Sequence, residues 1–242
     1  MKIRGILVLV VVAGVAAALF PSAAYAGSLT TDNPLGPYKS ASGGGEFSVV
    51  AFSEVISKPA DDMLHGLNPD VLFQTFCIER NENVGAGKTY YTELSEEAKK
   101  GGYAGGSPDP LDLRTSYLFY HFWKADTTVL HDYDFTGGAA LRALDAAQLQ
   151  NAIWFIEGEI TTLNLTTQGG EYFTKADNAV NSGAWDWHHG VKVINMWTDS
   201  TKTTFIQDWL VVVPLPGSAL MGFGLLFGLG AMHLIRRKRQ VL

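Results

Sequence analysis

The sequence has a single cysteine, Cys77, among its 242 residues. One cysteine excludes an intramolecular disulfide framework and a cysteine-rich zinc site. Charged residues make up only 17% of the chain, and the net charge of −6 argues against a nucleic-acid partner, which needs a basic face. The phosphate-binding, dinucleotide-binding, serine-hydrolase and zinc-protease motifs are all absent from the sequence. We therefore expect neither an enzyme nor a cofactor.

The charged residues that are present are unevenly distributed. All acidic side chains lie between Asp32 and Asp208, whereas the first residues combine a short basic region with an apolar run. Ala24 and Ala26 then provide the small side chains that signal peptidase accepts at its cleavage site. We therefore predict a signal peptide over residues 1–26 and export of the chain that follows. An uncleaved membrane anchor is the alternative.

The C-terminal segment, residues 214–242, has the features of a membrane helix with a basic end. A proline motif lies at its start and is made of Val213, Pro214, Leu215 and Pro216. Prolines lack the amide donor and end a preceding strand. The uncharged stretch 217–235 is long enough to cross the hydrocarbon core as a helix. Four basic residues come next: Arg236, Arg237, Lys238 and Arg239. Because basic clusters stay cytoplasmic, the acidic middle is expected outside the membrane.

The order of proline motif, apolar helix and basic cluster resembles the PEP-CTERM sorting signal of exported bacterial proteins. The motif here is Val-Pro-Leu-Pro, where the family usually has Val-Pro-Glu-Pro. The resemblance implies that an exosortase removes the helix and that the domain is released or transferred to the cell envelope or extracellular matrix. A plain single-span membrane anchor is the alternative.

The middle of the chain, residues 27–213, has the length of one domain, and 47% of the whole chain is apolar. Short runs of β-branched and aromatic residues predict strands, and apolar residues three or four apart predict helices. The predicted strands are 47–56, 72–78, 88–94, 191–197 and 205–213, and the predicted helices are 114–123, 138–160 and 171–180. The longest predicted helix has its apolar positions at Leu141, Leu144, Leu149, Ala152, Ile153 and Ile156. Strands that flank a central helical segment predict an α+β domain.

Three clusters of polar residues suggest binding only weakly. His188 and His189 are adjacent, so their side chains point to opposite sides of an extended chain and at most one would ligate a metal. The acidic residues in segment 132–134 lack the further carboxylates of a calcium site. Glu157 and Glu159 lie two apart on a predicted helix and so do not share a face. We therefore expect no metal site.

Cys77 and Gln150 form the most informative pair. Cys77 lies on a predicted strand, and a lone thiol in an exported protein oxidises or pairs between chains unless it has another role. Gln150 lies among apolar residues of a predicted helix, where a buried amide is costly unless it is satisfied or consumed. Attack of the Cys77 sulfur on the Gln150 carbonyl would release ammonia and leave an internal thioester, which accounts for both residues.

The residues around this pair resemble the thioester domains of bacterial surface adhesins. That family has an aromatic-Cys motif on a strand and, downstream, a glutamine motif of the form hydrophobic-Gln-x-x-hydrophobic-hydrophobic. Phe76-Cys77 and the segment 149–154 match these motifs in the same order. Many adhesins have threonine before the glutamine, where this chain has Leu149. A wider likeness, over most of residues 72–239, is to PEP-CTERM proteins with the same arrangement.

This resemblance implies covalent capture in a single turnover. An amine or hydroxyl group of a surface or matrix partner would attack the thioester, take the Gln150 acyl group and free the Cys77 thiol. Phe76, Ile153 and Trp154 would exclude water from the bond. The base that would assist thioester formation has three candidates by residue type: His121, Glu79 and Glu157.

The same residues are compatible with two other functions. The first is a non-covalent matrix or biofilm protein, in which Cys77 is an ordinary small buried residue. The second is a transglutaminase-like acyltransferase that works through Cys77. Such an enzyme needs a histidine near the sulfur, and the candidates are His65, His121, His131, His188 and His189.

Overall fold

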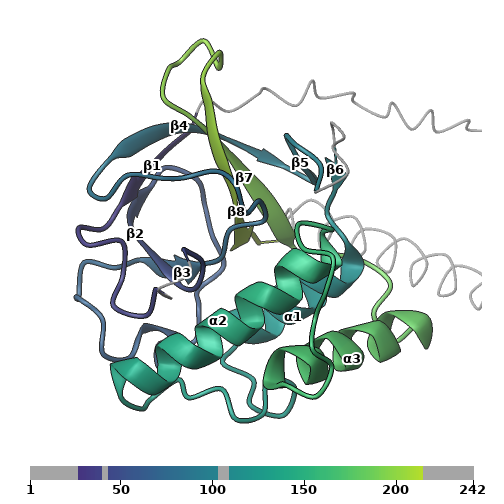
Figure 1. Ribbon diagram of the computed structural model, residues 1–242. Helices are drawn as coiled ribbons and strands as arrows, with labels where there is room; N and C mark the ends of the chain where they lie inside the picture. The colour runs from purple at the N-terminus through teal and green to yellow at the C-terminus, as the bar shows by residue number, and fades with distance from the viewer. Residues whose placement is uncertain (1–26, 40–42, 103–108, 215–242) are drawn as a thin grey trace, which may run out of the picture.

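The computed structural model describes residues 27–39, 43–102 and 109–214 (Figure 1). It is an α+β structure in which one curved antiparallel sheet packs against a layer of helices. Six strands form this half-barrel sheet in the order β3-β2-β1-β4-β7-β8. Their bounds are β1 Gly27–Thr31, β2 Phe47–Phe52, β3 Phe73–Thr75, β4 Thr89–Ser95, β7 Val191–Trp197 and β8 Phe205–Val212. The short strands β5 (Glu97–Ala98) and β6 (Asp109–Pro110) pair only with each other.

The last two strands form the best-covered part of the sheet. β7 pairs with β4 on one side and with β8 on the other, and nearly all of its residues are buried. Val193, Ile194 and Met196 are fully buried, as expected for a largely apolar strand that is covered on both faces. The predicted strands 88–94, 191–197 and 205–213 are thus confirmed nearly to the residue. β1 was not predicted; it begins at Gly27, the residue after the predicted cleavage site.

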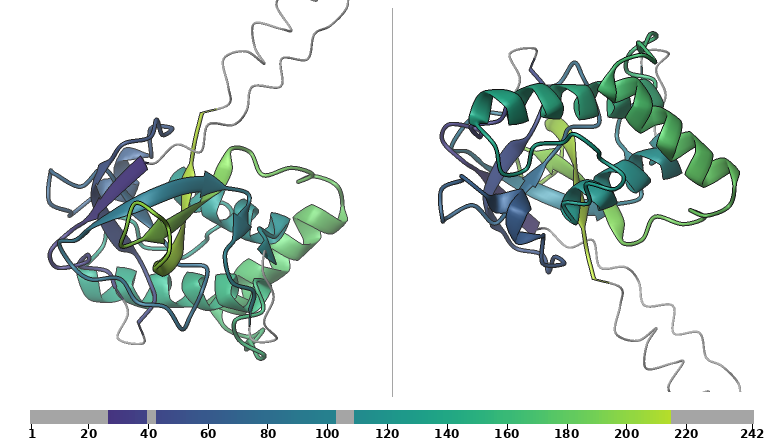
Figure 2. Two further views of the ribbon diagram at one scale, coloured as in Figure 1. Left: turned by 90° about the horizontal axis from the view of Figure 1, so that it is seen from above. Right: turned by 90° about the horizontal axis from the view of Figure 1, so that it is seen from below.

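The helices are α1 (Leu113–Trp123), α2 (Ala139–Ile156) and α3 (Gln168–Asn181), and a short 3₁₀ helix covers Asp61–Leu64. The Asp112 side chain caps α1 by accepting a hydrogen bond from the Arg114 amide. α1 packs on β7 and β8, and α3 contacts both other helices. Figure 2 shows this helical layer along one side of the sheet. The predicted α+β class, with helices between two groups of strands, is therefore confirmed.

The two edges of the sheet are joined by the segment 75–78, which lies between β3 and β8. Cys77 forms a single antiparallel bridge with Trp209 of β8, and the Ile78 amide donates to the Asp208 carbonyl over 3.0 Å. The predicted strand 72–78 is therefore shortened to β3, and Cys77 lies just beyond it. The position is still a fixed one, because both neighbours of Cys77 bond to the backbone of β8.

The longest helix differs from its prediction in two ways. α2 ends at Ile156 because Glu157 is its C-cap and Gly158 follows with φ of +74°, a left-handed conformation that ends a helix. The predicted helix 138–160 is thus too long, and Glu157 and Glu159 are not on a helix. Leu141 and Leu144 were expected in the core but are 58% and 65% exposed. The buried face of α2 begins at Arg142 and continues through Ala146 and Leu149.

The predicted signal peptide 1–26 lies outside the described residues, as does all of the predicted sorting segment 214–242 except Pro214, including Leu215, Pro216 and the basic cluster. Val213 and Pro214 are described and follow β8, and the Val213 amide donates to the Gly190 carbonyl over 2.8 Å. Within the described ranges, no helix combines the length and apolarity needed to span a bilayer. The signal peptide and the sorting helix stay predictions.

Candidate functional site: the Cys77–Gln150 pair

The structure brings Cys77 and Gln150 into contact although they come from different layers. Cys77 lies on the segment that joins the sheet edges, and Gln150 lies in the fourth turn of α2. The Cys77 Sγ atom is 3.3 Å from the Gln150 Oε1 atom. Both side chains are 1% exposed. The structure therefore brings the two predicted residues into direct contact, with the thiol against the amide oxygen.

The Gln150 amide is held by three further hydrogen bonds. Its Oε1 accepts from the backbone amides of Gly45 and Cys77, each over 3.3 Å. Its Nε2 donates to the Cys77 carbonyl over 2.7 Å. Exchanging the oxygen and nitrogen would place an NH₂ group against two N–H donors, so these bonds fix the orientation of the amide.

This hydrogen-bond pattern is that of an oxyanion hole. Sulfur attack on the Gln150 carbonyl would put negative charge on Oε1, where two backbone N–H groups already point. Donors fixed in a buried, low-dielectric site stabilise such charge more than water does. The leaving nitrogen is held at the same time by the Cys77 carbonyl. The hydrogen bonds that satisfy the buried amide would therefore also stabilise the charge that sulfur attack creates.

The glycine-rich loop around Gly44 covers the pair. A Cβ atom at Gly44 would lie 2.4 Å from Cγ of Gln150 and 2.8 Å from the Trp154 ring. Only glycine lets the backbone approach so closely, and the next amide is the one that bonds Oε1. The sequence predicted a loop at residues 43–45 but not that it covers the site.

The predicted shielding residues are all buried. Phe76 and Ile153 are fully buried, and Trp154 is 4% exposed. Phe76 packs edge-on against Phe122 of α1, with ring centroids 4.9 Å apart. Burial raises the pKa of the Cys77 thiol, against a smaller opposing effect of the Trp154 side chain. The thiol is therefore neutral at physiological pH, and it is protected from solvent and oxidants.

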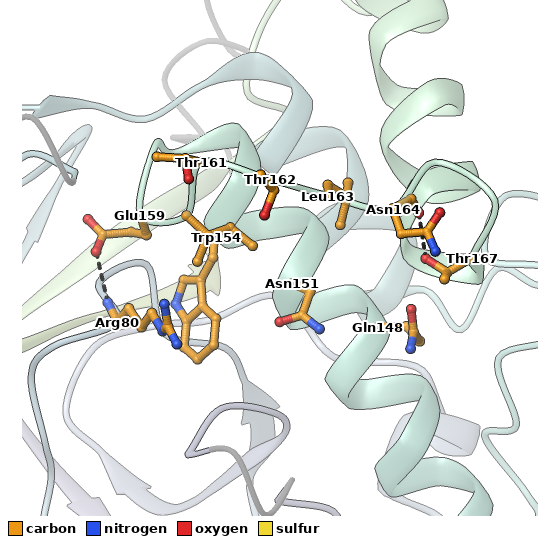
Figure 3. Close-up of a pocket in the computed structure, with 11 residues that line it drawn as sticks. Arg80, Gln148, Asn151, Trp154, Glu159, Thr161, Thr162, Leu163, Asn164 and Thr167 are labelled. Atoms are coloured by element: carbon orange, nitrogen blue, oxygen red, sulfur yellow. Dashed lines mark hydrogen bonds between the residues drawn. The ribbon is translucent and has the colours of Figure 1, made fainter.

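Trp154 also borders a cavity of about 570 Å³ on the outer side of α2 (Figure 3). Asn151 and Trp154 line it from the helix, and Thr161 and Thr162 line it from the chain that follows the helix. Arg80 lies beside Trp154, with its guanidinium carbon 5.8 Å from the ring centroid. Trp154 thus lines the cavity and also lies against the glycine loop that covers the buried pair.

The three base candidates lie in different places. His121 bonds through Nδ1 to Asp126, 2.8 Å away, and packs against Tyr117 and Trp185 rather than Cys77. Glu79 lies two residues after Cys77, and burial together with the nearby Asp208 raises the pKa of its carboxyl. Glu79 accepts a hydrogen bond from the Lys100 amide and Glu157 accepts one from the Asp112 amide, so the described contacts link none of the three candidates to the thiol by a hydrogen bond.

The histidine pair lies at a separate aromatic surface. His189 has φ of +51° and stacks between Trp185 and Trp187, at centroid distances of 3.7 and 4.2 Å. His131 bonds to Glu171. Within the part of the chain that the structure describes, no group of three or more potential ligands is arranged to hold a metal, and no histidine hydrogen-bonds to Cys77.

The segment 132–134 also has a different role from the one considered for it. Tyr133 is buried, and its hydroxyl donates to Oε1 of Glu46 over 2.6 Å. Glu46 in turn pairs with Arg142 of α2, and both side chains are fully buried. This network ties the residue after Gly45 to α2 two turns before Gln150. No sequence pattern had indicated it.

The carboxyl of Glu157 makes stability depend on pH. Burial raises its pKa to about 8, above its usual value. The native state therefore binds a proton that the unfolded chain releases, so stability falls as pH rises from about 5 to 8. We expect Glu157→Gln, which keeps an acceptor for the Asp112 amide, to be about 2 kcal/mol more stable than the wild type at pH 9 and equal to it at pH 4.

Urea unfolding at the two pH values measures this effect. Asp70→Asn is the control, because it removes a negative charge from an exposed site. Equal pH profiles for Glu157→Gln and the wild type would contradict the assignment.

Comparison of the chain with protein-family models, curated proteins and solved structures finds no match.

Proposed function

We propose that this chain is an exported bacterial surface or matrix protein that captures a partner covalently through an internal thioester between Cys77 and Gln150. The observation that carries the proposal is the contact of Sγ with the Gln150 amide while two backbone N–H groups point at its oxygen. The same contact places the only thiol of the chain against the one amide that the glutamine motif singles out.

Formation of the bond is an acyl transfer within the chain. The Cys77 sulfur attacks the Gln150 carbonyl carbon, and negative charge develops on Oε1. The C–N bond then breaks, and the thiol proton leaves with the nitrogen as ammonia. Capture reverses the role of the sulfur: an amine or hydroxyl of the partner attacks the same carbon, and Cys77 leaves as a thiol. The partner is left attached through an amide or an ester.

The test is the intact mass of the protein, expressed full-length in an export-competent bacterium and purified. We expect a mass lower by one ammonia, and a methylamine adduct after incubation with that amine. Cys77→Ala and Gln150→Ala should each lose both features, because each removes one end of the bond. A wild-type mass without the deficit, together with no methylamine adduct, would rule out the thioester.

The alternative function is a non-covalent matrix module sorted by an exosortase. It is favoured by the burial of Cys77, since free cysteine is often a small core residue. In that case partner binding survives Cys77→Ala. A transglutaminase-like enzyme is less well supported, since the histidines with described contacts bond or stack elsewhere.

The proposal for location rests on the sequence. Signal peptidase would cleave after Ala26, and an exosortase would act at the proline motif after β8. Before that step the protein would be anchored by its C-terminal helix, with the basic cluster in the cytoplasm. The described domain would then lie outside the cell, at the cell envelope or in the extracellular matrix.

A further inference from the structure

The cavity beside Trp154 has no role in forming the thioester, yet it adjoins the site (Figure 3). We propose that this cavity binds a neutral saccharide and directs one of its hydroxyl groups to the Gln150 acyl carbon, so that capture produces an ester. This inference rests on the proposed thioester and adds the chemical class of the captured partner.

The hydrogen-bonding groups of the cavity match hydroxyl groups. The Asn151 amide and the Thr161 and Thr162 hydroxyls each offer both a donor and an acceptor. None of these three side chains hydrogen-bonds to another described residue. A saccharide hydroxyl also donates and accepts, whereas an ammonium group only donates. Free groups of both kinds therefore favour a polyhydroxylated ligand over a lysine side chain.

The charges of the cavity are balanced. Arg80 is its cation and Glu159 its carboxylate, and Oε2 of Glu159 accepts from the Arg80 amide over 3.1 Å. A guanidinium and a carboxylate side by side leave the wall without a net charge, so the cavity selects neither a cation nor an anion by charge. A neutral ligand fits such a wall. The indole of Trp154 borders the cavity but is 4% exposed, so the polar groups carry the recognition.

Trp154 connects binding with reaction. It follows Gln150 by one helical turn, lines the cavity, and lies against the same glycine loop that covers Gln150. A small rotation of this side chain would open the buried bond to a ligand already in the cavity. The ligand oxygen would then attack the acyl carbon, the S–C bond would break, and the hydroxyl proton would end on the Cys77 sulfur.

The experiment compares nucleophiles on the full chain by intact mass. The probes are a panel of neutral hexose and N-acetylhexosamine oligosaccharides, Nα-acetyllysine, and methylamine, which is small enough to need no binding cavity. The variant Asn151→Ala/Thr162→Ala removes two cavity groups, and Asn178→Ala is the control on the exposed face of α3. We expect an oligosaccharide adduct that hydroxylamine cleaves. It should form about tenfold more slowly in the double variant and at the wild-type rate in the control, with methylamine rates unchanged in both.

Three results would overturn the inference while leaving the thioester intact. The first is a methylamine adduct without an adduct from any oligosaccharide of the panel. The second is an oligosaccharide adduct whose rate is the same in the double variant. The third is faster reaction of Nα-acetyllysine that depends on Asn151 and Thr162. A wild-type protein that shows neither the ammonia deficit nor a methylamine adduct would instead refute the proposed function.

Discussion

Gly44→Ala should leave the protein folded but slow thioester formation by at least about a hundredfold. The added methyl group would lie 2.4 Å from Cγ of Gln150, so the amide or the loop must move. Either movement breaks the alignment of Oε1 with the amides of Gly45 and Cys77. A displacement of about 1 Å at reacting groups is enough for a loss of this size.

The measurement is the fraction of protein that lacks one ammonia, followed over time after synthesis. Gly138→Ala is the matched control, because a Cβ there meets nothing within 4 Å and its φ is −68°. Circular dichroism checks that both variants are folded. A Gly44→Ala protein that loses ammonia as quickly as the wild type would show that the loop does not align the reaction.

Much of the fold could be predicted from local pattern. α1, β4, β7 and β8 lie within about two residues of their predicted bounds, because each has a strong apolar run or periodicity that packing does not override. β1 has no such signal, since its sequence Gly-Ser-Leu-Thr-Thr offers one large apolar residue. The end of α2 was missed because Ile156 and Ile160 continue the helical spacing across Gly158, whose left-handed conformation ends the helix.

The residues of the candidate site also fall into those that the sequence predicts and those that it does not. Cys77 and Gln150 could be found from the sequence because a lone exported thiol and an amide in an apolar helix each need an explanation. The contact of the Gly45 amide could not be found, since it depends on how distant segments pack. Three consecutive glycines did indicate unusual backbone freedom, but the sequence does not say what that backbone approaches. The Leu141 and Leu144 positions show the same limit, because periodicity does not reveal where a buried face begins.

The buried ion pair of Glu46 and Arg142 is the support of that loop. Nε and Nη2 of Arg142 donate to the two carboxylate oxygens of Glu46, each over 2.8 Å, and Nη1 donates to the Phe135 carbonyl over 2.7 Å. Because Glu46 follows Gly45 directly, the pair fixes the loop to the same helix that carries Gln150. Buried pairs contribute little net stability, but breaking one leaves an uncompensated buried charge.

Arg142→Met should therefore destabilise the protein by about 4 kcal/mol, because it leaves the Glu46 carboxylate buried without its cation. Glu46→Leu/Arg142→Met removes both charges and should recover most of this loss in urea unfolding. Arg114→Met is the control: its partners Asp112 and Asp177 are partly exposed, so the cost should stay near 1 kcal/mol.

The double variant should nevertheless form the thioester slowly, since apolar side chains replace the directed bonds that place the Gly45 amide. A double variant as unstable as Arg142→Met would contradict the charge argument, and wild-type ammonia loss in it would show that the loop is aligned without the pair.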